Sequence, residues 1–166
     1  MIRETEKRLL PGAACAVLFV HGILGSPAQF APFLPLVPQD WSFCNLLLQG
    51  HGGGARDFSA ASMAVWREQT RQAFAELRAQ HETVVIAAHS MGTLFAVQEA
   101  VRSPVEGLFL LNVPLHVHVR PRALHNAWLN YGGTPRDPWG QAAVAAYGVE
   151  RDRNVLHYAG WPPRFF

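Results

Sequence analysis

The chain contains 166 residues, 49% of them hydrophobic and 16% charged, with a formal net charge of +2. This length and balance suit a single soluble globular domain and exclude a disordered or fibrous chain. The arginines are scattered along the sequence, so nucleic acid is not expected as a partner. No apolar run is long enough to span a membrane, and residues 1–8 lack the apolar stretch of a signal peptide. We therefore expect no transmembrane segment and a cytoplasmic location.

Two buried strands are predicted in the first third of the chain. Residues 16–20 form an apolar run that leads into His-Gly-Ile-Leu-Gly at 21–25. Residues 41–48 form a second, mostly apolar run that leads into Gln-Gly-His-Gly-Gly at 49–53. Short apolar runs bounded by glycines are typical of buried strands in a parallel sheet. Between the two strands, residues 27–36 predict a short helix whose length is limited by prolines.

The middle of the chain predicts a helix, a strand and a second helix. After Ser62, apolar side chains recur every three or four residues, as in an amphipathic helix that packs on a sheet. They are Met63, Trp66, Thr70, Phe74 and Leu77. Residues 84–88 then predict a strand, and a second helix follows Ser90 and ends at 103–104, a Ser-Pro pair. The side chains of this second helix that we expect to face inward are Leu94, Val97 and Val101.

Residues 108–113 predict a fourth strand, so strands and helices alternate along the chain. This alternation predicts an α/β fold, with a parallel sheet, right-handed crossover connections and helices on both faces. In an open parallel sheet, ligands bind beyond the carboxyl ends of the strands. Residues 21–23, residues 50–52 and Ser90 lie at such ends, and we expect them to share one cleft.

Ser90 lies where a catalytic nucleophile would be displayed. It occurs in Ala-His-Ser-Met-Gly, directly after a predicted strand and directly before a predicted helix. In a nucleophile elbow, a tight strand-to-helix turn pushes the serine hydroxyl clear of the backbone. The turn needs small residues because chain segments cross closely there, and Ala88 and Gly92 supply them, although alanine at 88 replaces the usual glycine. His89 is expected to pack or hydrogen-bond at the turn rather than to act in catalysis.

Together, the three strand ends resemble those of the α/β-hydrolase family over roughly residues 14–113. The sequence is most similar to the carboxylesterase and monoacylglycerol-lipase branch. The resemblance implies an α/β-hydrolase fold and a serine hydrolase that cleaves a small-molecule carboxylic ester without a cofactor. It implies Ser90 as nucleophile, and an oxyanion hole formed by the backbone N–H groups of Met91 and Ile23. The residues expected to support this site are His21, Gly22, His89 and Gly92.

A second histidine-glycine segment offers an alternative oxyanion loop. His51-Gly52-Gly53-Gly54 resembles the oxyanion tetrad of another hydrolase branch. In that branch the tetrad follows the strand that precedes the first helix of the core, whereas here one predicted helix separates it from Ser90. The order of the elements therefore favours His21-Gly22, and we interpret residues 51–54 as a mobile, glycine-rich loop.

The acid and the histidine of a catalytic triad are not found in the sequence. In the family they follow the serine, on loops at the ends of two later strands, and no such segments follow Val113. Residues 114–166 are rich in proline, tryptophan and tyrosine, which resembles the helical cap of the family. We therefore expect a core at 1–113, a cap-like helical segment at 114–166 and an amino-terminal part of a longer hydrolase, without its carboxy-terminal strands.

Alternatives to these assignments involve residues of the cap-like segment. An improvised acid–histidine pair is less expected there than ordinary cap residues, and its candidates are His125, Asp137, Asp152 and His157. His116 and His118 are too few ligands for zinc, so no metal is expected. The whole chain is alternatively a catalytically silent binding or regulatory module.

Two further properties concern the core. Cys15 and Cys44 are expected to be buried free thiols, because the chain lacks a secretory signal. Loss of later strands would leave the edge of the 108–113 strand unpaired and apolar, and self-association along that edge is then expected.

Overall fold

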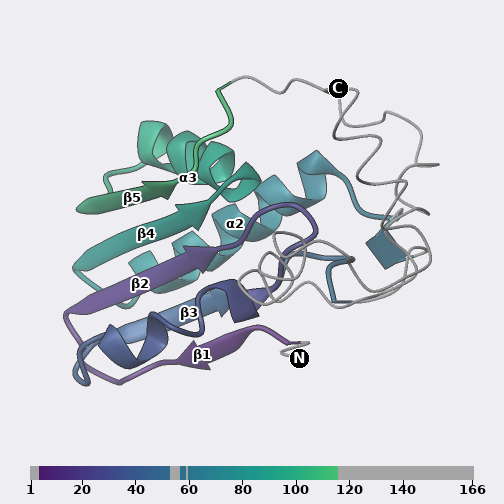
Figure 1. Ribbon diagram of the computed structural model, residues 1–166. Helices are drawn as coiled ribbons and strands as arrows, with labels where there is room; N and C mark the ends of the chain where they lie inside the picture. The colour runs from purple at the N-terminus through teal and green to yellow at the C-terminus, as the bar shows by residue number, and fades with distance from the viewer. Residues whose placement is uncertain (1–3, 53–56, 59, 116–166) are drawn as a thin grey trace.

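The computed structural model describes residues 4–52, 57–58 and 60–115 (Figure 1). The predicted cap at 114–166 lies almost wholly outside these residues. So do the alternative acid–histidine pair and the paired histidines at 116 and 118. The division of the chain at residue 113 therefore stays a prediction.

The core is a five-stranded sheet with the order β1-β3-β2-β4-β5. Its strands are β1 (Glu6–Arg8), β2 (Cys15–Val20), β3 (Ser42–Leu46), β4 (Thr83–His89) and β5 (Gly107–Leu111). The last four run parallel to one another, and β1 pairs antiparallel with β3. The predicted parallel sheet is therefore confirmed, and the carboxyl ends of its parallel strands meet at one side (Figure 1).

Strand β1 was not predicted from the sequence. Its residues Glu6, Lys7 and Arg8 are all charged, and they show none of the apolar alternation that identifies a strand. Lys7 forms an ion pair with Glu76, in which the two charged atoms lie 2.7 Å apart. A short charged strand at the margin of a sheet discourages pairing with another chain, so this lateral edge is blocked.

Helices α2 and α3 pack on the same face of the sheet, behind it in the view of Figure 1. Helix α2 (Met63–Arg78) begins at Ser62, whose hydroxyl accepts the Val65 N–H, and it buries Trp66 and Phe74 against the sheet as predicted. Helix α3 (Met91–Arg102) packs beside α2. This face holds the larger of the two hydrophobic clusters.

The predicted inward face of α3 is wrong. Leu94 and Val97 are each 39% exposed and Val101 is 82% exposed. The buried residues instead follow one another at helical spacing from the start of the helix, and they include Gly92, Phe95, Ala96 and Glu99. Gly92 lies against the end of β2, and this contact fixes the rotation of the helix about its axis. The turn at Ser90, rather than the apolar pattern, decides which side faces the sheet.

The opposite face of the sheet carries only 3-10 helices among the described residues. Instead of the single short helix predicted at 27–36, two turns form, η1 (Pro27–Gln29) and η2 (Leu34–Leu36). Prolines in this segment remove backbone donors that a longer helix requires. Phe30 packs on Phe19 of β2, with ring centroids 5.0 Å apart. This cover lies over β2, β3 and β4.

Two smaller predictions concern the membrane and the cysteines. No helix in the described part of the chain is long and apolar enough to cross a membrane. Cys15 and Cys44 are free thiols on neighbouring strands, and Cys44 alone is fully buried. Burial raises the pKa of the Cys44 thiol to about 11, so it is protonated at neutral pH.

Candidate active site

Ser90 occupies a strained turn between β4 and α3. Its backbone has φ 50° and ψ −122°, a conformation that L-residues rarely adopt and that costs of order 1–3 kcal/mol. Its N–H donates to the Leu111 carbonyl at 2.9 Å, and its own carbonyl accepts the Thr93 hydroxyl at 2.6 Å. The half-buried serine is thus held in this conformation from both β5 and α3.

Strain is concentrated at the carboxyl ends of the strands. Among the described residues, the non-glycine residues with positive φ are Leu24, Ser90 and Asn112. They follow β2, β4 and β5, which are neighbours in the sheet. Strained residues of this kind cluster at functional sites, where the surrounding structure holds them in place.

Two glycines let the turns after β2 and β4 approach each other. A Cβ atom added to Gly92 would collide with the carbonyl oxygens of Val20 and His21, the latter at 2.7 Å. A Cβ added to Gly22 would lie 2.9 Å from the Cβ of Ser90. The structure therefore brings the His21-Gly22 segment next to Ser90, at a distance that only glycine permits.

His21 is a buried, neutral residue. Its Nε2 accepts the Leu48 N–H at 3.1 Å, and its Nδ1 lies 2.8 Å from the Gly22 carbonyl oxygen. Because a carbonyl oxygen only accepts, Nδ1 must carry the ring proton. Burial, followed by the nearby His51, lowers the pKa of His21 to about 3. Both ring nitrogens are thus committed to the backbone, and this ring cannot serve as a general base.

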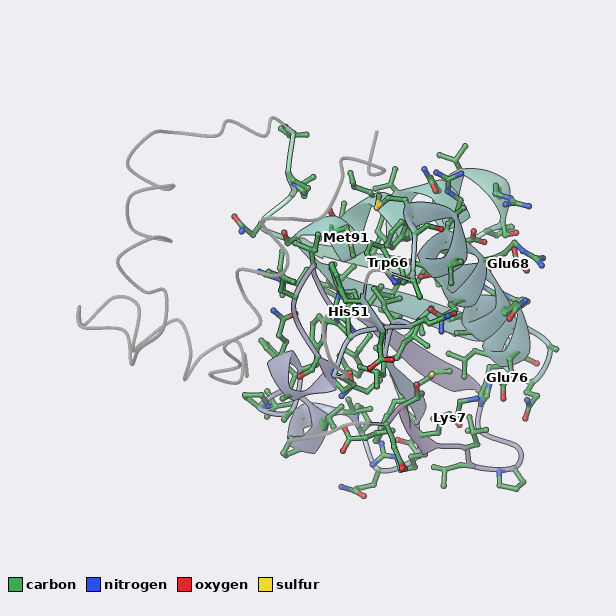
Figure 2. The ribbon with its side chains drawn as sticks, turned by 90° about the vertical axis from the view of Figure 1, so that its right-hand side faces the viewer. Lys7, His51, Trp66, Glu68, Glu76 and Met91 are labelled. Carbon is green, nitrogen blue, oxygen red and sulfur yellow. The ribbon has the colours of Figure 1, made fainter. Side chains whose placement is uncertain are left out.

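His51 packs within a cluster of rings. Its ring lies 4.8 Å from that of His21, 4.9 Å from that of Phe58 and 5.0 Å from that of Trp66, measured between centroids. Figure 2 shows His51 near Trp66. Burial lowers the pKa of His51 to about 4. Gly50 and Gly52 on either side have positive φ. The glycines allow the turn as expected, but His51 itself is a buried core residue.

The turn after β2 carries amides that point to two different partners. The Gly22 N–H donates to Oε1 of Gln29 at 3.1 Å, and the Gly25 N–H donates to the Gly22 carbonyl at 3.1 Å. By contrast, the N–H groups of Ile23 and Met91 have no acceptor among residues 4–52, 57–58 and 60–115. Ile23 is 42% exposed. Sequence reasoning missed Gln29, because no motif signals a side chain that bonds the backbone seven residues earlier.

No histidine in the described part of the chain donates to or accepts from the Ser90 hydroxyl. His89 is next to Ser90 in the chain and half buried, and desolvation lowers its pKa. The serine that does pair with a histidine is Ser42, whose Oγ lies 2.8 Å from Nε2 of His81. Ser42 is fully buried at the start of β3, far along the sheet from Ser90.

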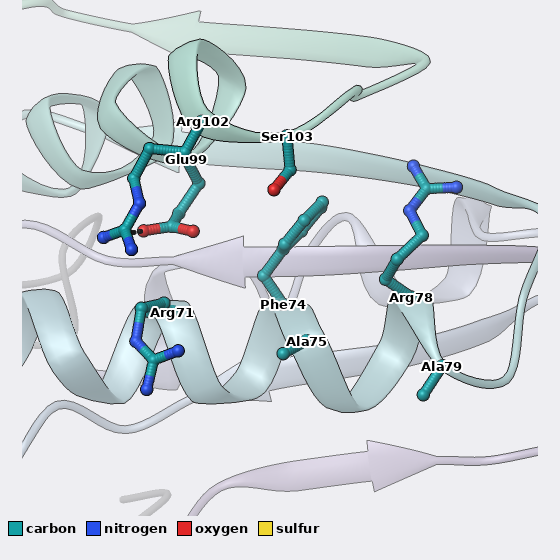
Figure 3. Close-up of a pocket in the computed structure, with 8 residues that line it drawn as sticks. All are labelled: Arg71, Phe74, Ala75, Arg78, Ala79, Glu99, Arg102 and Ser103. Atoms are coloured by element: carbon teal, nitrogen blue, oxygen red, sulfur yellow. Dashed lines mark ion pairs between the residues drawn. The ribbon is translucent and has the colours of Figure 1, made fainter.

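A groove of about 340 Å³ lies elsewhere, between α2 and α3 (Figure 3). Its arginines face acidic partners: Arg71 pairs with Glu68, and Arg102 lies 4.0 Å from the buried Glu99. The groove includes neither Ser90 nor the turn after β2. Its charges are balanced within the chain, so we regard it as ordinary polar surface.

Similarity to known proteins identifies the family of the chain. A sequence profile described as "Alpha/beta hydrolase family" matches residues 17–166. The chain belongs to the α/β-hydrolase family. No protein of curated function matches it in sequence.

Solved structures share the α/β-hydrolase fold. A metagenome-derived lipolytic enzyme, from work on LipS and LipT, aligns over 82% of this chain and 54% of its own, with TM-score 0.65 and 22% identity. A monoacylglycerol lipase from Paleococcus ferrophilus aligns over 79% and 51%, with TM-score 0.54 and 16% identity. A thioesterase domain from the curacin biosynthetic pathway aligns over 94% and 65%, with TM-score 0.56 and 20% identity.

At these identities the structural likeness establishes the fold alone. The chain spans about half the length of the first two of these α/β hydrolases. Hydrolysis in general is the activity of the family.

Proposed function

We propose that the protein is a serine hydrolase that acts on small-molecule carboxylic esters, with Ser90 as its nucleophile. The observation that carries this proposal is the strained, half-exposed Ser90 at the strand-to-helix turn, with the amides of Ile23 and Met91, which have no acceptor among the described residues. Such a strained conformation is typical of a serine whose hydroxyl is presented at a fixed point for catalysis. No cofactor is required.

The reaction would proceed by acyl transfer to the serine. The Ser90 oxygen attacks the ester carbonyl carbon, its proton passes to a base, and the carbonyl oxygen becomes an oxyanion. The N–H groups of Ile23 and Met91 would donate to that oxyanion, and removing one such donor costs roughly 3–4 kcal/mol of the activation barrier. Collapse of the intermediate expels the alcohol, and water later releases the acid.

The catalytic base must come from outside the described residues. His21 and His81 are committed to backbone and hydroxyl partners, and His51 is enclosed by aromatic rings. We propose that the acid and the histidine follow on later strands of the sheet, as in the family. His89 would support the turn rather than accept the serine proton.

The substrate class rests on the fold and on the neighbours' names. The relatives named above are a lipolytic enzyme, a monoacylglycerol lipase and a thioesterase domain, and all of these names denote hydrolysis of an acyl bond. We propose an esterase or lipase activity in the cytoplasm. A residue or two at the rim of the cleft would set the acyl length.

A fluorophosphonate probe tests Ser90 against Ser42, whose hydroxyl contacts a histidine. In the intact protein, labelling should occur and should vanish in Ser90→Ala, because the variant lacks the attacking oxygen. Ser42→Ala is the matched control and should label at the wild-type rate. Undiminished labelling of Ser90→Ala, or loss of labelling in Ser42→Ala with the fold retained, would refute the assignment.

A catalytically silent binding module is the second candidate. It is favoured by the Ser90 hydroxyl having no histidine partner in the described part of the chain. This protein would bind an ester or a fatty acid without turnover. A wild-type protein that binds a short-chain ester but neither hydrolyses it nor reacts with the probe would establish this alternative.

A further inference from the structure

The side chain of Gln29 reaches the turn that carries the Ile23 amide. Its Oε1 atom accepts the Gly22 N–H at 3.1 Å. The backbone N–H can only donate, so the oxygen and not the nitrogen of the side-chain amide faces Gly22. Gln29 is the last residue of η1, and it lies outside every motif that identified the site.

The backbone segment that carries Gln29 is itself fixed to the sheet. The Ser26 hydroxyl accepts the Ala28 N–H at 3.3 Å at the start of η1. The buried Asn45 of β3 donates from Nδ2 to the Pro27 carbonyl at 2.9 Å. Phe30, which follows Gln29, packs on Phe19. A side chain on such a supported segment can hold a partner at a set position.

The Gly22 carbonyl is restrained as firmly as the Gly22 N–H. It accepts the Nδ1–H of His21 at 2.8 Å and the N–H of Gly25 at 3.1 Å. The peptide between Gly22 and Ile23 is trans, since no cis peptide occurs in the described residues. Its N–H therefore points away from its carbonyl. Hydrogen bonds on one side of this peptide thus aim the Ile23 N–H to the other side.

Gly25 leaves the space that Gln29 fills. A Cβ atom added to Gly25 would lie 2.8 Å from Oε1 of Gln29 and 2.9 Å from the Gly22 carbonyl oxygen. Such a contact would displace the side chain or the turn. The glycine at this position is therefore matched to the glutamine.

We propose that Gln29 is a positioning residue for the oxyanion hole. By binding the Gly22 N–H, its side chain fixes the turn so that the Ile23 amide stays aimed at the oxyanion that forms beside Ser90. The inference rests on the proposed function, since it needs Ser90 to react. It assigns to Gln29 no contact with the substrate.

The principal test is Gln29→Met, with Gln80→Met as the matched control. Methionine keeps the length of the side chain and removes the acceptor. Gln80 makes only a surface contact, from Nε2 to the Glu76 carbonyl at 3.2 Å. With a short-chain nitrophenyl ester and the intact protein, kcat should fall about tenfold or more in Gln29→Met with KM within about twofold, since a misaimed donor loses transition-state stabilisation selectively. Gln80→Met should match the wild type in both constants.

Two further variants separate positioning from general destabilisation. Gly25→Ala should lower kcat in the same way, because it acts on the same contact from the opposite side. Gln29→Glu keeps an acceptor oxygen, and hydrogen exchange of the Gly22 amide should stay slow in it but accelerate in Gln29→Met. If Gln29→Met fails to fold, Gly25→Ala and Gln29→Glu carry the test.

The outcomes are distinct for the two proposals. A wild-type protein whose Ser90 does not react overturns the proposed function, and the role of Gln29 with it. A reactive wild type together with unchanged kcat in both Gln29→Met and Gly25→Ala overturns the role of Gln29 alone. A loss of kcat that is accompanied by a loss of thermal stability, with hydrogen exchange of the Gly22 amide unchanged, would show a merely structural role.

Discussion

The two ends of the sheet each hold a serine and a histidine, yet they differ in strain and in hydrogen bonding. At the amino end, His81 donates from Nδ1 to the Leu77 carbonyl, and its Nε2 lies 2.8 Å from the Ser42 hydroxyl oxygen. Ser42 also accepts the Leu10 N–H at 3.0 Å. At the carboxyl end, Ser90 is half exposed and strained, and the neighbouring amides of Ile23 and Met91 have no acceptor among the described residues.

If Ser90 is the nucleophile that we propose, this difference distinguishes a reactive serine from a structural one. The Ser42–His81 pair satisfies every polar atom it contains, in a place that no substrate reaches. Around Ser90, in contrast, the backbone is strained, and two N–H donors have no acceptor among the described residues, which lowers stability unless another group uses them. A hydrogen bond between serine and histidine is therefore weaker evidence for catalysis than strain and open donors at the ends of strands.

The largest effect is expected from Gly92→Val. The added side chain would collide with backbone oxygens of β2, which cannot move without shifting the strand. We expect a loss of about 3 kcal/mol in the free energy of unfolding, together with loss of reactivity. Gly12→Ala is the control near the amino end, since Gly12 has positive φ but open space around it, and it should cost only about 1–2 kcal/mol. Thermal or denaturant unfolding measures both, and a stable, reactive Gly92→Val protein would contradict the elbow.

The pH dependence of stability probes the histidines of the carboxyl end. The pKa values of His21 and His51 are lowered to about 3 and about 4 in the folded chain, from about 6.5 when unfolded. Above about pH 6.5 both rings are neutral in either state. Below it the unfolded chain binds more protons, so stability falls as pH drops toward 4, by at most about 1.4 kcal/mol per pH unit for each ring.

His51→Phe isolates one of these contributions. Phenylalanine suits the surrounding rings and cannot bind a proton, so the slope of unfolding free energy between about pH 6 and 4.5 should decrease by the contribution of one ring. Urea unfolding at several pH values gives the slope. An unchanged slope would mean that His51 is not buried as a neutral ring.

Replacing each of the two serines should change stability in opposite directions. Ser42→Ala leaves the Leu10 N–H and a His81 nitrogen unpaired, and should destabilise by about 1–3 kcal/mol. Ser90→Gly relieves the positive φ, and should stabilise by about 1 kcal/mol while abolishing probe labelling. Chemical denaturation compares the two variants. A destabilised Ser90→Gly protein would show that the turn is not strained.

The features that sequence predicted are those fixed by local pattern. The strands that lead to His21 and Ser90 are short apolar runs followed by glycines or small residues, a pattern that predicts them directly. The small residue Gly92 likewise predicts the close crossing of chain segments at the turn. The amphipathic helix α2 is likewise predicted by the spacing of its apolar residues.

The features that sequence missed depend on tertiary contacts. The rotation of α3 is set by the approach of Gly92 to β2, so the apolar Val101 ends on the exposed side. The contact of Gln29 with Gly22 and the pairing of Ser42 with His81 each join residues with no shared pattern. Strand β1 consists of charged residues and is held by its partner β3.

The two edge strands of the sheet, β1 and β5, also differ in how well they are protected from pairing with another chain. Substitutions on them are expected to have the smallest effect. Strand β1 is short and charged, whereas β5 has no strand beyond it in the described residues. Phe109 on β5 is 62% exposed. We predict that the 166-residue chain associates with a second copy along β5, since unpaired backbone groups beside apolar side chains favour strand pairing. Phe109→Lys should shift the chain toward monomer in a sedimentation concentration series. Lys7→Arg on β1 keeps the charge of the control edge and should leave the wild-type association intact. A wild-type chain that stays monomeric throughout the series would show that β5 is covered by other residues of the chain.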